Sequence, residues 1–258
     1  MAYNSFTYLF IFLPLCWVAW AVLPQRYRPA ALLGGSLVFY WMMAGTYTVW
    51  LLLAAALTWQ LGRVLGRLQT LQAATVPTLE PAARKAAKQQ FTVLQKSVVA
   101  AGAAGLLGLL VWLKYLPFLV KSMNGVLALL PFGWQVSAPT LLQPVGLSFF
   151  TLMALSYLLD VRRGAAQPAD HYWQVLLYLS FWPHVVEGPF DRWAQVSPTL
   201  LDPPKPNYHA FTFGVQRILW GMMKKLIIAD RANMYVKAVF DNWTAYSGAA
   251  VVVATSLY

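Results

Sequence analysis

The chain has 258 residues, of which 59% are hydrophobic and only 10% are charged, whereas ordinary soluble domains carry about 25% charged residues. Its 19 Lys and Arg residues outnumber 8 Asp and Glu residues, which gives a net charge of +11. The basic residues gather at the ends of apolar runs, as loop charges of membrane proteins do, so the charge does not indicate nucleic-acid binding. The single cysteine, Cys16, lies inside an apolar run and cannot form an internal disulfide.

The first predicted membrane span is Phe6–Leu23, in which Pro14 predicts a kink that neighbouring helices can accommodate. Because residues 1–5 contain no basic side chain, we interpret this segment as an uncleaved span and not as a signal peptide. The next charge-free run, residues 29–62, would be about 51 Å long as one helix, well beyond the ~30 Å hydrocarbon core. Basic residues flank both of its ends and place them in the cytoplasm. The run is therefore predicted to be a helical hairpin of two short spans that turns near Gly45.

The longest polar stretch, residues 63–96, contains six basic residues and one acid. Pro81 suits the first turn of a helix, and residues 82–95 are good helix formers. We therefore predict a cytoplasmic loop with an interfacial helix. Its charge is expected to orient the protein in the membrane, and a specific lipid site is the alternative.

Residues 97–113 are rich in Gly and Ala at a spacing that lets helix backbones approach closely in lipid. Lys114 and Lys121 then bracket a short apolar piece, which Pro117 and Pro131 are expected to break. A re-entrant or interfacial segment fits this piece better than a complete span.

Three further spans are predicted at Leu141–Leu159, Tyr172–Val186 and Phe211–Ala229. Basic residues inside the last of these must snorkel or line a wet cavity. A final apolar run from Ser247 is too short to cross a bilayer before Tyr258, so we expect a chain that is incomplete at its C-terminus. The predicted fold class is all-α: a polytopic transmembrane protein with about seven or eight membrane segments, a re-entrant or interfacial piece, and one membrane domain over residues 1–258.

One distinctive stretch is PVGLSFFTLMALSYLLDVRRG, residues 144–164. Pro144 and Gly146 are expected to start a helix, and small polar residues within it can hydrogen-bond across helices. Asp160 with Arg162 or Arg163 predicts a salt-bridged helix end at the membrane interface.

A second distinctive stretch is FWPHVVEGPFDRW, residues 181–193. Its prolines and glycine stop a helix and bend the chain. Irregular backbone at membrane depth survives only inside protein or along a water-filled cavity. His184, Glu187, Asp191 and Arg192 are therefore candidates to line a substrate path, while the catalytic residue stays unknown. The alternative is an ordinary interfacial loop held by an acid–arginine pair.

Motifs of the common catalytic frameworks are missing. The sequence has no H-E-x-x-H, C-x-x-C or carboxylate cluster with metal spacing, so we expect no metal site and no bound cofactor. It also lacks the G-x-S-x-G, P-loop and Rossmann glycine patterns. His171 and His209 are interpreted as surface residues.

Four stretches, in this order, carry a family resemblance: FTYLFIFLPL, the segment 144–164, the segment 181–193, and GVQRILWGMMKKLIIADRANMYVKAVF. Together they resemble the membrane-bound O-acyltransferase family, in particular its bacterial alginate O-acetylase-like branch. The resemblance implies an inner-membrane enzyme that transfers an acyl group from a thioester, with acetyl-CoA as co-substrate. The acceptor would be a hydroxyl of an exopolysaccharide such as alginate or cellulose, or a periplasmic acetyl-transfer partner, and the only other partner would be membrane lipid.

In this family a histidine inside a membrane tunnel acts as general base, which suits an imidazole that titrates near neutral pH. That histidine belongs to a Trp-Arg-x-Trp-His pattern, which this chain does not contain, so the chain resembles the N-terminal half of a family member and is expected to be inactive alone. His184 and Glu187 stand where branch members carry glutamine and a small residue. We interpret His184 as a polar wall residue, and a substitute base is the alternative. A competing hypothesis for the chain is a non-enzymatic polysaccharide export component or one scaffold half of a split membrane protein.

Overall fold

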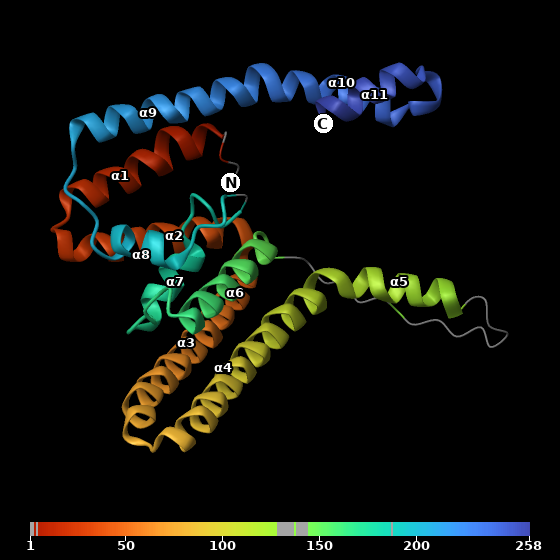
Figure 1. The fold of residues 1–258 in the computed structure, drawn as a ribbon. Coiled ribbons are helices and arrows are strands. Elements are labelled where there is room, and N and C mark those ends of the chain that lie inside the picture. The colour runs from red at the N-terminus through yellow and green to blue at the C-terminus, as the bar shows by residue number, and fades with distance from the viewer. Residues whose placement is uncertain (1–2, 4, 128–136, 138–143, 187) are drawn as a thin grey trace. The chain divides into compact units, whose positions relative to one another are not determined.

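The computed structural model describes residues 3, 5–127, 137, 144–186 and 188–258 (Figure 1). Within these ranges the chain forms helices joined by turns and no strand, which confirms the all-α prediction for the described residues. Chain contacts divide it into two compact units, Thr7–Pro204 and Lys205–Tyr258. That residues 1–258 form one membrane domain stays a prediction.

The helices of the first unit are α1 (Leu13–Val22), α2 (Arg28–Ala44), α3 (Thr48–Thr75), α4 (Pro81–Leu110), α5 (Leu116–Leu127), α6 (Leu147–Arg163), α7 (Tyr172–Ser180) and α8 (Trp193–Leu201). The second unit contains α9 (Tyr208–Met223), α10 (Asp230–Asp241) and α11 (Gly248–Leu257).

Two predicted irregularities near the N-terminus appear where the sequence placed them. Pro14 lies in the first turn of α1, directly after a π-helical segment, Thr7–Phe12, because proline has no N–H to continue a regular bonding ladder. Gly45 separates α2 from α3 and adopts φ +55°, a conformation that glycine reaches without a Cβ penalty. A break in the run 29–62 is therefore present at Gly45, whereas α2 and α3 hardly contact each other, so their packing as a helical hairpin is not confirmed.

The polar stretch 63–96 differs from its prediction. α3 continues to Thr75 as a 28-residue helix, and a short 3₁₀ turn leads into α4, a 30-residue helix that starts at Pro81. α3 and α4 pack side by side in Figure 1. The predicted helix start at Pro81 is confirmed, but the second short span and the separate interfacial helix are wrong. No proline interrupts residues 63–75 or 82–110, and helix formers there extend both helices.

The piece between Lys114 and Lys121 is helical. A π-helical segment, Val111–Tyr115, joins α4 to α5, and the chain changes direction there (Figure 1). Pro117 is the second residue of α5 and has no N–H for the carbonyl four residues before it, which falls inside this π-helical segment. The interruption expected at this proline therefore takes the form of an irregular turn and a change of direction, while the helix itself continues. Pro131 lies outside the described residues, and the re-entrant or interfacial placement stays a prediction.

Two of the three later spans are revised. α6 begins after Gly146, as predicted, and has 17 residues, while residues 141–143 lie outside the described part. α7 has only nine residues, about 14 Å, so the predicted span Tyr172–Val186 is wrong. The helix ends three residues before Pro183, which cannot continue it.

In the second unit, α9 runs through a π-helical segment, Lys224–Ala229, into α10 without a turn. The basic residues of this stretch therefore do not interrupt the helix. They lie exposed, as does much of the apolar surface around them, including Leu219, Ile227 and Ile228.

The described chain has membrane character. Two helical runs, Gln25–Thr78 and Pro81–Leu127, are long and apolar enough to cross a bilayer by length and composition. Two shorter apolar helices, Thr7–Val22 and Gly248–Leu257, accompany them. The predicted count of seven or eight segments is not confirmed, because α6 and α7 are too short to pass the same test.

The core of the first unit lies where α3, α4, α6 and α7 pack against one another. In the Gly/Ala-rich part of α4, leucine side chains of α3 and α6 fill the space beside Gly102, where a Cβ would lie 2.7 Å from Leu61 Cδ1 and 2.8 Å from Leu158 Cδ1. The small residue thus admits side chains of neighbouring helices, and close approach of the helix backbones stays a prediction. A Cβ at Gly108 would meet no atom of the described residues within 4 Å.

Candidate functional site

The residues that follow α7 form a polar turn, residues 181–192, whose backbone is closed by its own hydrogen bonds. The N–H groups of His184 and Val185 each donate to the Phe181 carbonyl at 3.1 Å. The Gly188 N–H donates to the His184 carbonyl, also at 3.1 Å. These bonds satisfy the peptide groups of a segment that proline and glycine keep out of a helix.

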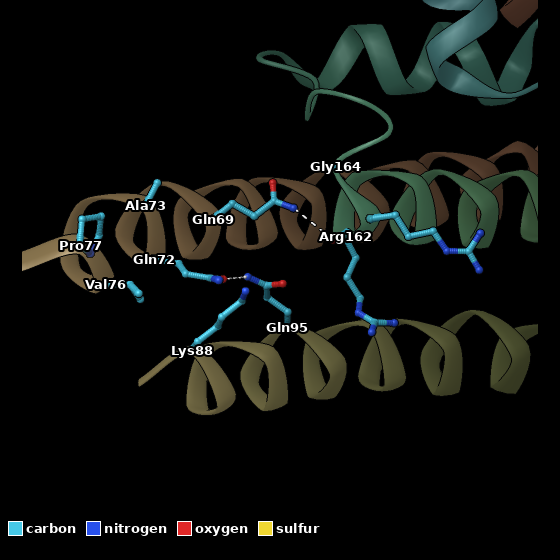
Figure 2. A pocket seen from close by; sticks show the side chains of 10 residues that line it. Gln69, Gln72, Ala73, Val76, Pro77, Lys88, Gln95, Arg162 and Gly164 are labelled. Atoms are coloured by element: carbon cyan, nitrogen blue, oxygen red, sulfur yellow. Dashed lines mark hydrogen bonds between the residues drawn. The ribbon is translucent and has the colours of Figure 1, made fainter. Parts of the chain in front are cut away.

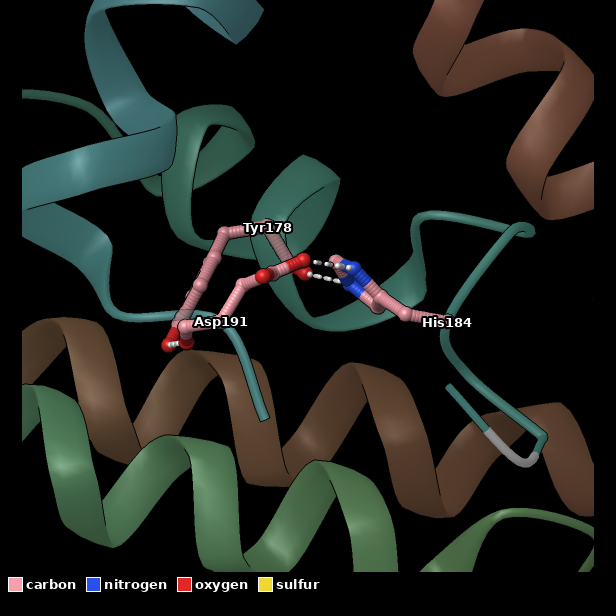
Figure 3. Close-up of polar contacts among 3 residues, drawn as sticks. All are labelled: Tyr178, His184 and Asp191. Atoms are coloured by element: carbon pink, nitrogen blue, oxygen red, sulfur yellow. Dashed lines mark hydrogen bonds and ion pairs between the residues drawn. The ribbon is translucent and has the colours of Figure 1, made fainter. Parts of the chain in front are cut away.

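His184 is the buried centre of the polar turn, with 2% of its surface exposed. Its Nε2 atom donates to the backbone carbonyl of Tyr178 at 2.9 Å, and its Nδ1 atom lies 3.3 Å from Oδ2 of Asp191 (Figure 3). The Asp191 side chain is 39% exposed. A buried imidazole is thus held between a peptide carbonyl and a carboxylate that reaches the surface.

This pairing determines what the ring of His184 can do. A carbonyl oxygen only accepts hydrogen bonds, so Nε2 is the donor toward Tyr178, while Nδ1 faces the Asp191 carboxylate. Both ring nitrogens of the buried imidazole are therefore directed at groups of the turn itself and not at a substrate path. The geometry therefore favours a structural role for His184 over the role of a substitute base.

Tyr178 and Trp193 support the polar turn, although sequence reasoning did not select either residue. The Tyr178 hydroxyl donates to the backbone carbonyl of Asp191 at 2.6 Å. The Trp193 ring packs edge-on against Tyr178 and Tyr157, and its Nε1 atom donates to the Gln167 carbonyl at 3.0 Å. Two aromatic residues in largely apolar surroundings gave no signal in the sequence beyond hydrophobic burial.

Glycine contacts bring the polar turn against the start of α6. A Cβ at Gly188 would lie 2.1 Å from His184 Cα, and a Cβ at Gly146 would lie 2.1 Å from the Val185 carbonyl oxygen. Gly146 also adopts φ +73°. The two distinctive stretches of the sequence, 144–164 and 181–193, therefore form one packed unit.

The four predicted path residues have different outcomes. His184 and Asp191 are brought together, whereas Arg192 is exposed, precedes α8 and forms no ion pair within the described chain. Glu187 lies outside the described residues. The acid–arginine pair expected for a plain interfacial loop is thus replaced, among described residues, by the His184–Asp191 pair. That these side chains line a substrate path stays a prediction.

The predicted salt bridge at the end of α6 is wrong. Asp160 is buried, with 4% of its surface exposed, and the described residues include no ion pair between it and Arg162 or Arg163. Its Oδ2 atom has no hydrogen-bond partner in the described part of the chain. Arg162 is two positions away, and side chains at that spacing point to different faces of a helix. Arg163 is at the favourable spacing of three positions, but its side chain is exposed whereas Asp160 is buried.

His171 and His209 are both exposed, as predicted. Across the described ranges, no three His, Cys, Asp or Glu side chains gather closely enough to hold a metal ion.

Comparison with known proteins places this geometry in context. No protein-family profile matches the chain, and no solved structure matches it. Proteins named "Probable alginate O-acetylase AlgI" from Pseudomonas aeruginosa and Azotobacter vinelandii are 31% and 30% identical to it, each over 237 residues and 89% of the chain. The chain is similar to these alginate O-acetylases over most of its own length. The "Peptidoglycan O-acetyltransferase" of Helicobacter pylori is 25% identical over 167 residues, which cover 54% of the chain and 30% of that protein.

These matches support the resemblance to the alginate O-acetylase-like branch of the membrane-bound O-acyltransferases. The aligned region covers 40% of the P. aeruginosa protein and 42% of the A. vinelandii protein. The chain thus spans less than half the length of these alginate O-acetylases. These similar proteins are named for acetylation of alginate and of peptidoglycan.

Proposed function

We propose that the chain is part of a multi-pass, inner-membrane O-acyltransferase that acetylates an exopolysaccharide such as alginate or cellulose. The observation that carries this proposal is the similarity to alginate O-acetylases over 89% of the chain. The similarity to a peptidoglycan O-acetyltransferase supports acetyl transfer to a polymer hydroxyl as the wider activity.

In the proposed reaction, an acceptor hydroxyl oxygen attacks the carbonyl carbon of an acetyl thioester, with acetyl-CoA as the donor. The C–S bond breaks, an ester C–O bond forms, and the hydroxyl proton passes through a general base to the departing thiolate. The acceptor is a sugar hydroxyl or a periplasmic acetyl-transfer partner. The base would be the family's Trp-Arg-x-Trp-His histidine, which residues 1–258 do not supply.

The polar turn would form a fixed part of the wall along which donor and acceptor meet. His184 would hold the turn closed through the Tyr178 carbonyl and Asp191, while Asp191 and Arg192 present exposed polar atoms. Irregular backbone of this kind suits a water-filled path through a membrane protein.

The test is complementation with the complete reading frame that encodes this chain. It would be expressed in an alginate-producing bacterium that lacks its own O-acetylase, and acetyl groups on secreted alginate would be counted by proton NMR. Restored acetylation supports the proposal. Unacetylated alginate from a strain in which the protein is present in the membrane would refute alginate acetylation, and cellulose acetylation is then measured in the same way.

A further inference from the structure

A cleft of about 500 Å³ lies away from the polar turn, where α3, α4 and the C-terminal end of α6 meet (Figure 2). Its volume falls within the range of about 300–1,000 Å³ that small-molecule sites occupy. Basic residues around the α3–α4 connection place this end of the helices on the cytoplasmic side. None of the candidate path residues of the polar turn lines it.

The lining of the cleft is cationic. Lys88, Arg162 and Arg163 contribute three positive charges, and none of the described lining residues is acidic. No carboxylate in the described chain forms an ion pair with any of the three. The two arginines lie in the last turn of α6, where they also complement the helix dipole, but Lys88 belongs to the first half of α4 and has no such reason to be there.

Three glutamine side chains also line the cleft, and hydrogen bonds hold them in place. Gln95 is buried, with 8% of its surface exposed, and its Nε2 atom donates to Oε1 of Gln72 at 2.8 Å. Gln69 Nε2 donates to the Val161 carbonyl at 2.6 Å, which ties α3 to α6. Because Gln72 accepts through its oxygen, its own N–H groups remain donors. Figure 2 shows Lys88 reaching from α4 toward the Gln72–Gln95 pair.

Among the described residues, no hydrogen bond or ion pair engages the guanidinium group of Arg162 or Arg163. Both groups are therefore available for an external acceptor.

We propose that this cleft binds a phosphate-bearing anion at the cytoplasmic end of the helices. Guanidinium groups match phosphate oxygens with paired N–H donors, and lysine adds a point charge. The anion is either a soluble phosphorylated compound or the headgroup of an anionic phospholipid. For coenzyme A as the ligand the proposal rests on the proposed acetyl transfer, because acetyl-CoA is its donor, whereas binding of pyrophosphate or of a lipid headgroup does not depend on that activity.

The experiment uses the protein in nanodiscs of neutral phosphatidylcholine. Calorimetric titration with inorganic pyrophosphate and with coenzyme A measures binding of a soluble phosphorylated ligand. Native mass spectrometry of the detergent-solubilised protein, with phosphatidylglycerol or phosphatidylcholine added, measures binding of a lipid headgroup. The variants are Lys88→Gln and the double variant Arg162→Gln/Arg163→Gln. The matched control is Lys96→Gln, which removes one exposed charge from α4 outside the cleft.

Loss of one charge-assisted contact is expected to weaken binding on the order of tenfold in the cleft variants, and the control should change it by less than about twofold. An effect on pyrophosphate or coenzyme A assigns a soluble ligand, whereas selective loss of bound phosphatidylglycerol assigns a lipid headgroup. The proposal would be overturned if neither experiment detects binding, or if Lys96→Gln weakens binding as much as the cleft variants do. The side chain of Lys88 is exposed, so its substitution should leave the thermal midpoint unchanged and keep the comparison valid.

Discussion

Replacing Gly146 with alanine tests whether the start of α6 fixes the polar turn. The residue adopts φ +73°, which costs a non-glycine residue about 1–2 kcal/mol. An alanine Cβ would also lie 2.1 Å from the carbonyl oxygen of Val185. Backbone must move to relieve that contact, and overpacking of this kind costs about 1–3 kcal/mol. The expected total loss of unfolding free energy is therefore about 2–5 kcal/mol.

Gly164 offers a matched control at the other end of the same helix. It has the same φ of +73°, but a Cβ there would meet nothing within 4 Å. Gly164→Ala should therefore cost only the conformational part, about 1–2 kcal/mol. Unfolding in mixed micelles, followed by far-UV circular dichroism, compares the two variants. Equal losses would show that Val185 does not press on Gly146 and would refute the packed unit described above.

Three further substitutions test the site and its surroundings. Asp191→Asn should lower the free energy of unfolding by about 1.5–3 kcal/mol, because the buried His184 side chain loses its carboxylate partner. Asp230→Asn, the control, removes an exposed ion pair worth about 0.2–1 kcal/mol, and chemical unfolding compares the two variants. Arg28→Met should lower the midpoint of thermal unfolding far more than Arg26→Met does. Of these two arginines only Arg28 is buried and donates hydrogen bonds to two backbone carbonyls. Similar unfolding midpoints for the two variants would contradict this prediction. His184→Gln in the complementation assay should reduce acetylation by less than about tenfold, since loss of a general base costs about 10²–10⁴-fold; a loss in that larger range would make the histidine the base.

Several elements of the fold follow from local chemistry and could be predicted from the sequence. Pro14, Gly45 and Gly146 mark irregular backbone or helix ends because proline lacks an N–H and glycine lacks a Cβ. The start of α4 at Pro81 has the same local origin. Element lengths were harder to predict, because polarity along residues 63–96 indicated a loop while helix propensity, without a breaker, continued both helices.

The candidate site was likewise predictable in part from the sequence. The sequence identified His184 and Asp191 as unusual polar residues beside an apolar segment, and the relatives support the family to which that segment points. It could not identify the partners of the imidazole, because the Tyr178 carbonyl is a backbone group that every residue carries. The role of Trp193 was hidden for a similar reason, since burial alone does not say which rings meet.

Composition and the order of the motifs led by themselves to the all-α class, to the membrane character of the chain and to its resemblance to O-acetylases. Only the tertiary structure decided which polar groups meet: the histidine with a carbonyl and a carboxylate, and three cations around a cleft between α3, α4 and α6. The physical reason is the distance along the chain over which each feature is determined. Helix starts and breaks depend on atoms within a few residues, whereas these pairings join side chains whose positions depend on how separate helices pack.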